Sequence, residues 1–578
     1  MRIRALSMAV AALALAAVAL PACGTKAPPP AAQPPCAGTT GVGGAVPEGS
    51  APGDLVGAVQ LDGTDPDGEP SSGFPTGAQV FRILYVSTAA DEKDLHLVCG
   101  TVTLPEGGPA LSSNGRTRVL AWAHGTQGLE QQCLPSSDPS TGIWGVMPAG
   151  IQTVGWGSLL GRHRGDPADG QLQYAVDQGW MVATADYQPA DTYVLGRVAG
   201  ANVLDSVRAA RQLAGERFAP TADAGSDVVV AGHSQGGHAA LWAGQLADPY
   251  LDATGTDSTE VRLVGIEALA PAANFVVQPE RQPGTSFGDG LADREMHQSI
   301  GLLPFPVPAL EIQVGPALFS YIFGSWSQFS AGRTPSEDAV TPAGPATGPL
   351  ELDRVATPEG QSTIAQVQPL CLGGSDATVI KRLVAPYRDA EAHQMLVPEL
   401  WNLPEDYRTG EYFTGGVDRT CAEADATLDG WCEWIRWNMP GPLGDNPFPK
   451  VPTSGGRPVP LLIAQGTADT VIHCVAPADL PGAELPTVAD CTSRALYESM
   501  VDDYCPAEGD QAPLQLRLFR KGPNSPAEHL SIPGQMAARQ LGRSAGDLSF
   551  EGSPTQQFMD AAFAGTVPTG CDARVLNP

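Results

Sequence analysis

The residues with the clearest chemical meaning are Gly232-His233-Ser234-Gln235-Gly236-Gly237. They follow a β-branched run at residues 226–231, which predicts a buried strand. They precede a stretch rich in helix-forming residues, 238–246. A strand, a tight glycine-rich turn and a helix together hold a serine hydroxyl exposed at the tip of the turn. We therefore predict that Ser234 is a nucleophile.

A nucleophilic serine needs a carboxylate that orients its base. Residues 459–464 predict a strand, and Asp469 follows it directly after Gln465-Gly466-Thr467-Ala468. Asp445 and Asp479 are weaker acid candidates because neither directly follows a predicted strand. Asp469 is therefore the predicted acid.

The base must be a histidine, and of the nine histidines only His473 and His529 follow Asp469. His473 lies in the same loop as the acid, too close to bridge it to Ser234. His529 lies beyond the last predicted strand, residues 514–519. The resulting order Ser, Asp, His is that of the α/β-hydrolase fold.

A further predicted strand, residues 118–123, ends in His124-Gly125-Thr126-Gln127-Gly128. In α/β-hydrolases the loop after this strand lends one backbone N–H to the oxyanion hole, and the residue after the nucleophile supplies the other. The expected donors are Gln235 and Thr126, with Gly125 as the alternative to Thr126. His124 is expected to be structural.

The remaining pattern predicts the same fold. Strands at 180–187 and 262–270 flank an amphipathic helix at 202–213 and the Ser234 segment. Strands that alternate with helices and consist of apolar runs form a parallel sheet covered on both faces. Two strands at 81–86 and 95–102 read as an antiparallel entry hairpin.

The regular alternation stops between about 275 and 457, and this segment is predicted to be a large inserted, mainly helical cap. We predict a signal peptide at residues 1–22 and a Pro/Gly-rich tether at 23–53. The first part of the α/β-hydrolase core then covers 54–274, the cap 275–457 and the second part of the core 458–578.

Within the predicted cap, residues 299–330 carry a single charge, Glu311, among many apolar side chains. Trp431, Trp434 and Trp437 recur every three residues. Both features fit the packed core of the cap, and both fit equally the wall of an acyl-binding pocket. The sequence leaves this choice open.

The N-terminus predicts export. Arg2 and Arg4 precede a charge-free, Ala- and Leu-rich stretch. Leu20-Pro21-Ala22-Cys23 resembles a bacterial lipobox, in which the cysteine is lipidated and becomes the first residue. Cleavage after Ala19 and an uncleaved anchor helix are the alternatives. The tether that follows favours the lipoprotein, so the expected location is the cell envelope, or the medium if the chain is released.

The amino-acid composition limits the classes of partner and cofactor that the chain is expected to bind. Lys plus Arg is 33 and Asp plus Glu is 63, so the net charge of −30 argues against nucleic acid. Ten of the eleven cysteines follow Cys23 at scattered spacings without a C-x-x-C pair, which predicts disulfides rather than zinc or redox chemistry. No metal or other cofactor and no obligate protein partner is implied.

Several stretches resemble the secretory lipases of the α/β-hydrolase fold, the fungal lipase A type and its bacterial relatives. The resemblance covers roughly residues 53–571 and is weak in the cap. After Asp186-Tyr187 the family continues with glycines, whereas this chain has Gln188-Pro189-Ala190-Asp191 near the mouth of the predicted site. The resemblance implies hydrolysis of carboxylic esters, with lipids as substrates and no metal cofactor. The stretches that carry it are residues 51–56, 124–128, 133–136, 232–237, 466–471, His529 and the tail from 554 to 571.

We therefore expect a secreted or lipid-anchored serine hydrolase that cleaves carboxylic esters through a Ser-His-Asp triad and an acyl-enzyme intermediate. The apolar run in the cap favours lipids with medium or longer acyl chains. A short-chain carboxylesterase, an acyltransferase, an amidase or a thioesterase would use the same residues. A binding protein that has kept the fold and lost turnover is the distant alternative.

Overall fold

The computed structural model describes residue 36 and residues 45–61, 74–137, 170–221, 224–256, 259–274, 314–372, 374–384, 429–469, 471–472, 474–475, 484–486, 491–521, 527–537, 539–540 and 548–576. The predicted signal peptide, Cys23 and most of the predicted tether lie outside these residues. No helix in the described part of the chain has the length and apolar character needed to span a bilayer.

A ten-stranded sheet in the order β1-β2-β3-β5-β4-β6-β7-β10-β13-β16 organises the molecule. The first four strands in this order pair antiparallel, and the rest, from β5 to β16, pair parallel. This mostly parallel sheet confirms the predicted α/β-hydrolase fold. The strands are β1 (Leu55–Gln60), β2 (Ala78–Thr88), β3 (Leu95–Pro105), β4 (Thr117–Ala123), β5 (Met181–Ala185), β6 (Ser226–His233), β7 (Val261–Leu269), β10 (Leu461–Gly466), β13 (Pro513–Phe519) and β16 (Gly570–Leu576).

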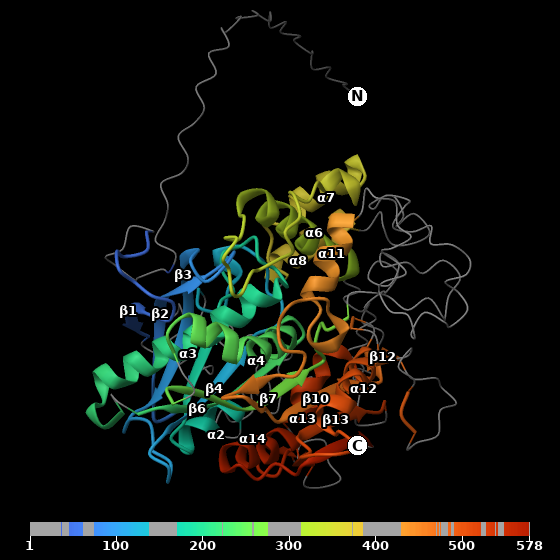
Figure 1. Cartoon of the computed structure of the whole chain (residues 1–578). Helices are drawn as coiled ribbons and strands as arrows, with labels where there is room; N and C mark the ends of the chain where they lie inside the picture. Colours follow the sequence, from blue (N-terminus) through green and yellow to red (C-terminus); the bar gives the residue numbers. More distant parts are fainter. Residues whose placement is uncertain are drawn as a thin grey trace, which may run out of the picture.

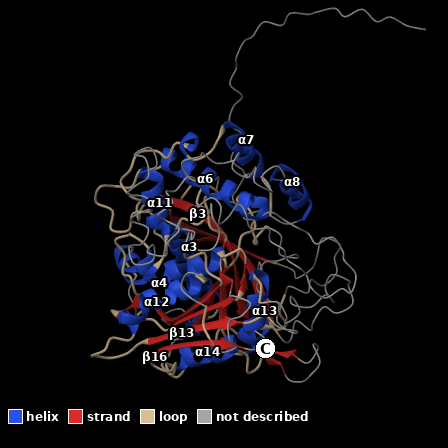
Figure 2. Ribbon diagram, turned by 90° about the vertical axis from the view of Figure 1, so that its right-hand side faces the viewer, coloured by secondary structure: helices blue, strands red, loops and turns tan. Residues whose placement is uncertain are grey.

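Helices cover both faces of the sheet. Successive residues of its central strands point to opposite sides, and because both sets are apolar, both faces must be buried. In β6, Val228 and Val230 pack into the cluster on one face, and Val229 and Ala231 pack into the cluster on the other. Figure 2 shows α4 and α12 on one side of the strands and α13 on the other. The first face holds α3 (Gly196–Arg217), α4 (Gln235–Ala253) and α12 (Thr492–Tyr504), and the second holds α2 (Gln171–Asp177), α13 (Ile532–Met536) and α14 (Pro554–Ala564).

The described helices between β7 and β10 gather at one end of the molecule (Figure 1), and no described residue between these strands joins the ten-stranded sheet. They are α6 (Val314–Gly332), α7 (Pro358–Val367), α8 (Gly374–Val384) and α11 (Asp429–Asn438). The predicted domain boundaries themselves stay predictions. The short elements are β8 (Thr453–Ser454), β9 (Arg457–Pro458), β11 (Ala468–Asp469), β12 (Cys474–Val475), β14 (Arg539–Gln540), β15 (Leu548–Ser549), η1 (Gln131–Cys133), η4 (Ala219–Thr221), η5 (Leu352–Arg354), η10 (Gly441–Leu443) and η11 (His529–Ser531).

Aromatic side chains form the core between α6 and α11. The Phe323 ring meets the Trp431 ring edge-on at 5.3 Å between centroids. The Trp434 ring lies 6.2 Å from that of Trp326 and 6.1 Å from that of Phe329. The described part of the apolar run at 299–330 therefore contributes core packing to these helices.

Disulfides confirm the predicted use of cysteine. Four bonds join eight of the ten cysteines that follow Cys23. Cys421 and the side chain of Cys432 lie outside the described residues. The bonds are Cys36–Cys99, Cys133–Cys371, Cys474–Cys491 and Cys505–Cys571.

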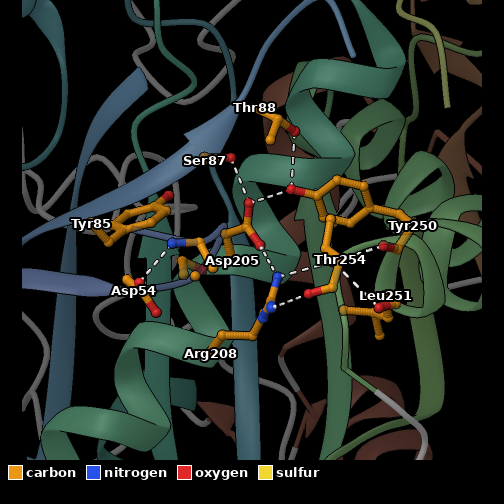
Figure 3. A network of polar contacts seen from close by, with 12 residues as sticks. Asp54, Tyr85, Ser87, Thr88, Asp205, Arg208, Tyr250, Leu251 and Thr254 are labelled. Carbon is orange, nitrogen blue, oxygen red and sulfur yellow. Dashed lines mark hydrogen bonds and ion pairs between the residues drawn. The ribbon is translucent and has the colours of Figure 1, made fainter. Parts of the chain in front are cut away.

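A buried polar network joins β2, α3 and the C-terminal end of α4 (Figure 3). The Asp205 carboxylate accepts hydrogen bonds from Ser87 Oγ at 2.7 Å, Tyr250 OH at 2.6 Å and Arg208 Nη1 at 3.0 Å. Arg208 also donates to the carbonyl oxygen of Thr254 at 3.1 Å. Because a buried charge is tolerated only when it is paired and hydrogen-bonded, this network holds α4 in one position against α3 and β2.

Glu267, on β7, is a second buried carboxyl group, and no charged side chain pairs with it among the described residues. Thr555 on α14 donates to its Oε1 at 2.5 Å, while its Oε2 has no hydrogen-bond partner among them. Burial, only partly offset by the Thr555 bond, raises the pKa of Glu267 to about 7.

We expect Glu267→Gln to change how stability depends on pH. The pKa of Glu267 in the folded protein lies above the unfolded value of about 4.3, so the folded state binds the proton more tightly. The contribution of this proton to the free energy of unfolding is therefore complete at low pH and is lost as the pH rises towards 7. Glutamine does not titrate, so the variant should gain on the order of 3 kcal/mol relative to the parent between pH 4.5 and pH 8. Urea unfolding across this range measures the gain.

The exposed Glu216 on α3 offers the control, since Glu216→Gln replaces a carboxyl group that is not buried. A stability difference between Glu267→Gln and the parent that does not change with pH would show that folding leaves the pKa of Glu267 unchanged, contrary to this prediction.

Candidate active site

Ser234 is the single residue between β6 and α4. Its backbone has φ 59° and ψ −117°, and residues other than glycine rarely adopt a positive φ. Its N–H donates to the carbonyl oxygen of Leu269 at 2.9 Å, which holds the turn in this strained form. A β-carbon added at Gly232 would fall on the Gly236 carbonyl, and one added at Gly236 would fall on the Ala123 carbonyl. The glycines of the motif are thus required by close packing, and the half-buried serine projects from the turn.

Asp469 and His529 lie together. His529 Nδ1 is 2.8 Å from Asp469 Oδ2, and both side chains are buried. Asp469 Oδ1 accepts from the backbone N–H groups of Val471 and Ile472, each at 2.9 Å, and Gln465 Nε2 reaches Oδ2 at 3.2 Å. Because an ionised carboxylate only accepts, Nδ1 of His529 carries the hydrogen and Nε2 is left as a base.

His529 packs against the residue that precedes Ser234. The Nε2 atom of His233 is 2.9 Å from the His529 carbonyl oxygen, and the two rings are 4.6 Å apart between centroids. The structure therefore brings the Asp469–His529 pair to the Ser234 turn. Of the weaker candidates, Asp445 is exposed, and Asp479 and His473 lie outside the described residues.

The loop after β4 lies against the same turn. A β-carbon added at Gly125 would stand 3.4 Å from the His233 carbonyl oxygen and 3.8 Å from the Ser234 Cβ. Gln235 is the first residue of α4, where backbone N–H groups have no partner within the helix. Gly125 and Gln235 thus both lie next to Ser234, and the oxyanion hole with its donors Gln235 and Thr126 or Gly125 stays a prediction.

Three links hold this loop against the segments around it. Thr126 Oγ1 is 2.8 Å from the hydroxyl of Tyr193, whose ring meets that of Tyr321 on α6 at 5.6 Å. The Gln127 carbonyl accepts from the N–H of Leu372 at 2.7 Å. The Cys133–Cys371 disulfide is the third link, and a β-carbon at Gly128 would press on its Cys133 sulfur.

His124 is placed where a structural role is expected. Its Nδ1 is 2.7 Å from the Gly125 carbonyl, and its ring stacks on Tyr187 at 4.3 Å. Complete burial lowers the pKa of His124 to about 4, so the ring is neutral.

The segment that departs from the lipase pattern is tied to its neighbours. The Gln188 side chain accepts from the Cys99 N–H at 2.7 Å and donates to Gln131 Oε1 at 2.5 Å. Asp191 pairs with Arg333, the residue directly after α6, at 2.5 Å. Residues 188–191 thus connect β3, η1 and the segment that follows α6.

Sequence reasoning missed the residues that support the site. His233 and Gln465 lie beside predicted functional residues but occupy positions at which the motifs prescribe no residue type. Tyr193 and Cys371 are brought to the loop after β4 only by the fold. Among the described residues, no group of three or more His, Cys, Asp or Glu side chains is arranged to hold a metal ion.

Comparisons with known proteins give one match to a family. Residues 170–293 match the model of the secretory lipase family, and this segment includes Ser234 and its glycines. No curated protein matches the chain.

Solved structures offer weaker likenesses. Candida antarctica lipase A in its closed state is 16% identical, covers 90% of this chain and 84% of its own, and has a TM-score of 0.48. The rice cell wall degrading esterase LipA of Xanthomonas oryzae, in a ligand-bound form, is 13% identical over 84% of this chain and 95% of its own, with a TM-score of 0.45. A putative hydrolase of Legionella pneumophila is 15% identical over 83% and 94%, with a TM-score of 0.43.

The family match falls on the segment that carries the nucleophile turn, and it confirms the resemblance that the sequence motifs indicate. Taken with the α/β-hydrolase sheet, this similarity of residues 170–293 to the secretory lipases indicates a carboxylic ester hydrolase.

Proposed function

We propose that the chain hydrolyses carboxylic esters with Ser234 as the nucleophile, His529 as its base and Asp469 as the group that orients the base. The observation that carries the proposal is the 2.8 Å contact between His529 Nδ1 and Asp469 Oδ2. The main chain of His529 is in turn hydrogen-bonded to His233, the residue before Ser234. This arrangement leaves His529 Nε2 as the acceptor for a serine proton.

The proposed reaction has two halves. Ser234 Oγ attacks the ester carbonyl carbon while His529 Nε2 takes its proton, and the carbonyl oxygen becomes an oxyanion. The C–O bond to the alcohol then breaks, and His529 gives its proton to the leaving alcohol. Water attacks the acyl-enzyme with His529 again as base, which releases the acid and restores Ser234.

The oxyanion would be held by backbone N–H groups of Gln235 and of the Gly125-Thr126 pair. Such donors act where the charge develops, and the loss of one typically costs about 10²–10³ in kcat. The Thr126–Tyr193 bond, the Leu372 bond and the Cys133–Cys371 disulfide support this loop, so the donors would be preorganised.

We propose lipids with medium or longer acyl chains as the substrates. One continuous apolar cluster contains side chains of α6 and α11, and it also includes Leu129 beside the loop after β4 and Ala272 beyond β7. The Ala272 N–H donates to the Ser234 carbonyl at 3.2 Å. Val471 and Ile472, which bind Asp469, pack against the same cluster. Apolar groups thus border the candidate site on three of its loops.

We expect kcat/KM to rise with acyl length from two to eight carbons. Each buried methylene is worth about 0.8 kcal/mol, so full burial of the extra methylenes would favour the octanoate over the acetate ester by about 3,000-fold. We expect a preference on the order of 10- to 1,000-fold, because the length of the pocket limits the gain. The measurement is kcat/KM for nitrophenyl esters of two to sixteen carbons, below their aggregation limits and normalised to active enzyme.

If acetate is the best substrate and octanoate is excluded, α6 and α11 form core only and the enzyme is a short-chain esterase. Matched amides, thioesters and acceptor alcohols in the same panel distinguish hydrolysis of esters from amidase, thioesterase and acyltransferase activity.

The disulfides and the secretory lipase match support an exported protein. We propose further that Cys23 is lipidated and holds the enzyme at the membrane through the Pro/Gly-rich tether. We expect the mass of the N-terminal peptide to show a lipid-modified Cys23, and Cys23→Ala to release active enzyme from the membrane fraction. A native chain that begins at Leu20 would instead show free secretion.

A further inference from the structure

His233 lies between the candidate base and the predicted oxyanion loop. Its ring is buried, with Nε2 2.9 Å from the His529 carbonyl oxygen and a centroid separation of 4.6 Å from the His529 ring. On its other side, a β-carbon added at Gly125 would be 3.5 Å from Nδ1 of His233. One side chain is therefore bonded to the segment of the candidate base and lies next to the loop after β4.

The contacts determine the tautomer of this ring. A carbonyl oxygen only accepts, so Nε2 of His233 carries the hydrogen and donates it to His529. Nδ1 is then an unprotonated acceptor, and it has no hydrogen-bond partner among the described residues. Burial lowers the pKa of His233 well below 6.5, and the nearby His529 lowers it further, so the ring is neutral.

A neutral His233 ring next to His529 is compatible with the transfer of the serine proton to His529. His529 gains a positive charge when it takes the serine proton, and a charged neighbour at 4.6 Å would oppose that step, whereas a neutral ring does not. The hydrogen bond is made to the main chain of His529, which leaves Nδ1 of His529 to Asp469 and Nε2 to Ser234.

We propose that His233 is a positioning residue, which donates to the His529 carbonyl and thereby keeps the His529 ring aligned between Asp469 and Ser234. The proposal rests on the proposed function, because it assigns His233 a role only through His529. No group is transferred to or from His233.

Two substitutions separate the hydrogen bond from the packing. His233→Phe keeps a ring and removes the donor, whereas His233→Gln keeps an N–H donor at about the reach of Nε2. His238 supplies the matched control. It is a buried histidine on α4, and its Nε2 is 2.8 Å from the carbonyl oxygen of Asn438 on α11. His238→Phe therefore loses a comparable buried contact away from the base.

We expect His233→Phe to lower kcat on the order of 10- to 100-fold with KM changed less than about threefold, because small misplacements of a base have effects of this size. His233→Gln should recover kcat to within about threefold of the parent, and His238→Phe should keep the parental kcat. The rate of labelling by a fluorophosphonate, which needs the same base, should follow kcat in all variants.

Equal kcat values for His233→Phe and His238→Phe, or a His233→Gln variant as slow as His233→Phe, would overturn the proposal. If His233→Phe does not fold, His233→Asn takes its place. Its shorter amide cannot reach the carbonyl, so kcat should still fall, and parental kcat in that variant also overturns the proposal. Failure of the proposed function is separate, since it would appear as a parent enzyme that neither hydrolyses esters nor reacts with the fluorophosphonate.

Discussion

Ser234→Ala should lower kcat for ester hydrolysis by about 10⁴- to 10⁶-fold, the size of loss seen when a nucleophile of this kind is removed. Ser234 is the residue that the strained turn between β6 and α4 presents, and alanine has no oxygen with which to attack the carbonyl. The main-chain bonds of the turn, Ser234 N–H to the Leu269 carbonyl and Ala272 N–H to the Ser234 carbonyl, do not involve the hydroxyl. The melting temperature should therefore remain near that of the parent.

Ser206→Ala is the matched control for this loss. Ser206 is a buried serine on α3 whose hydroxyl donates to the Val203 carbonyl at 2.8 Å, away from the candidate site. Its removal should leave kcat unchanged. A Ser234→Ala variant that keeps more than about a hundredth of the parental kcat would remove Ser234 from the mechanism.

Asp469→Asn should lower kcat by about 10⁴-fold while the fold is kept. The Oδ1 atom of Asp469 accepts from the N–H groups of Val471 and Ile472, so an asparagine will keep its oxygen there and turn its NH₂ group towards His529 Nδ1. Two donors cannot face each other, and His529 must then carry its hydrogen on Nε2. In that tautomer it has no lone pair for the serine proton.

His529→Ala should be as inactive as Asp469→Asn or more so, and the double variant should lose little beyond the worse single one, because the three residues act as a unit. Losses that multiply in the double variant would show that the two residues act independently. Asp445→Asn, at the exposed alternative acid, should retain the parental kcat.

The central strands could be predicted from sequence because they are buried on both faces and read as apolar runs, such as Val228 to Ala231 in β6. The edge strands β1 and β16 were not predicted. Their residues are partly exposed, and β16 carries Asp572 and Arg574 among small side chains, so no run or clean alternation marks it. The helix α3 begins earlier than predicted, because its first residues, 196–201, are all buried and so show no alternation of buried and exposed positions.

The places of Ser234 and Asp469 beyond strand ends could be predicted because each is tied to its strand by a local motif. His233 could not, since its role depends on a carbonyl in a turn almost three hundred residues away. The sequence also left two meanings open for the apolar run at 299–330. The contacts of Phe323, Trp326 and Phe329 with the tryptophans of α11 show a packing role, and the acyl preference stays a prediction.

The most direct test of the account is to label the intact, purified chain with a fluorophosphonate and to map the modified peptide by mass spectrometry. The account predicts stoichiometric modification of Ser234 with matching loss of ester hydrolysis, no labelling of heat-denatured chain, and much slower labelling of Asp469→Asn. Modification of a different residue, or full hydrolysis by a chain whose Ser234 is completely modified, would contradict it.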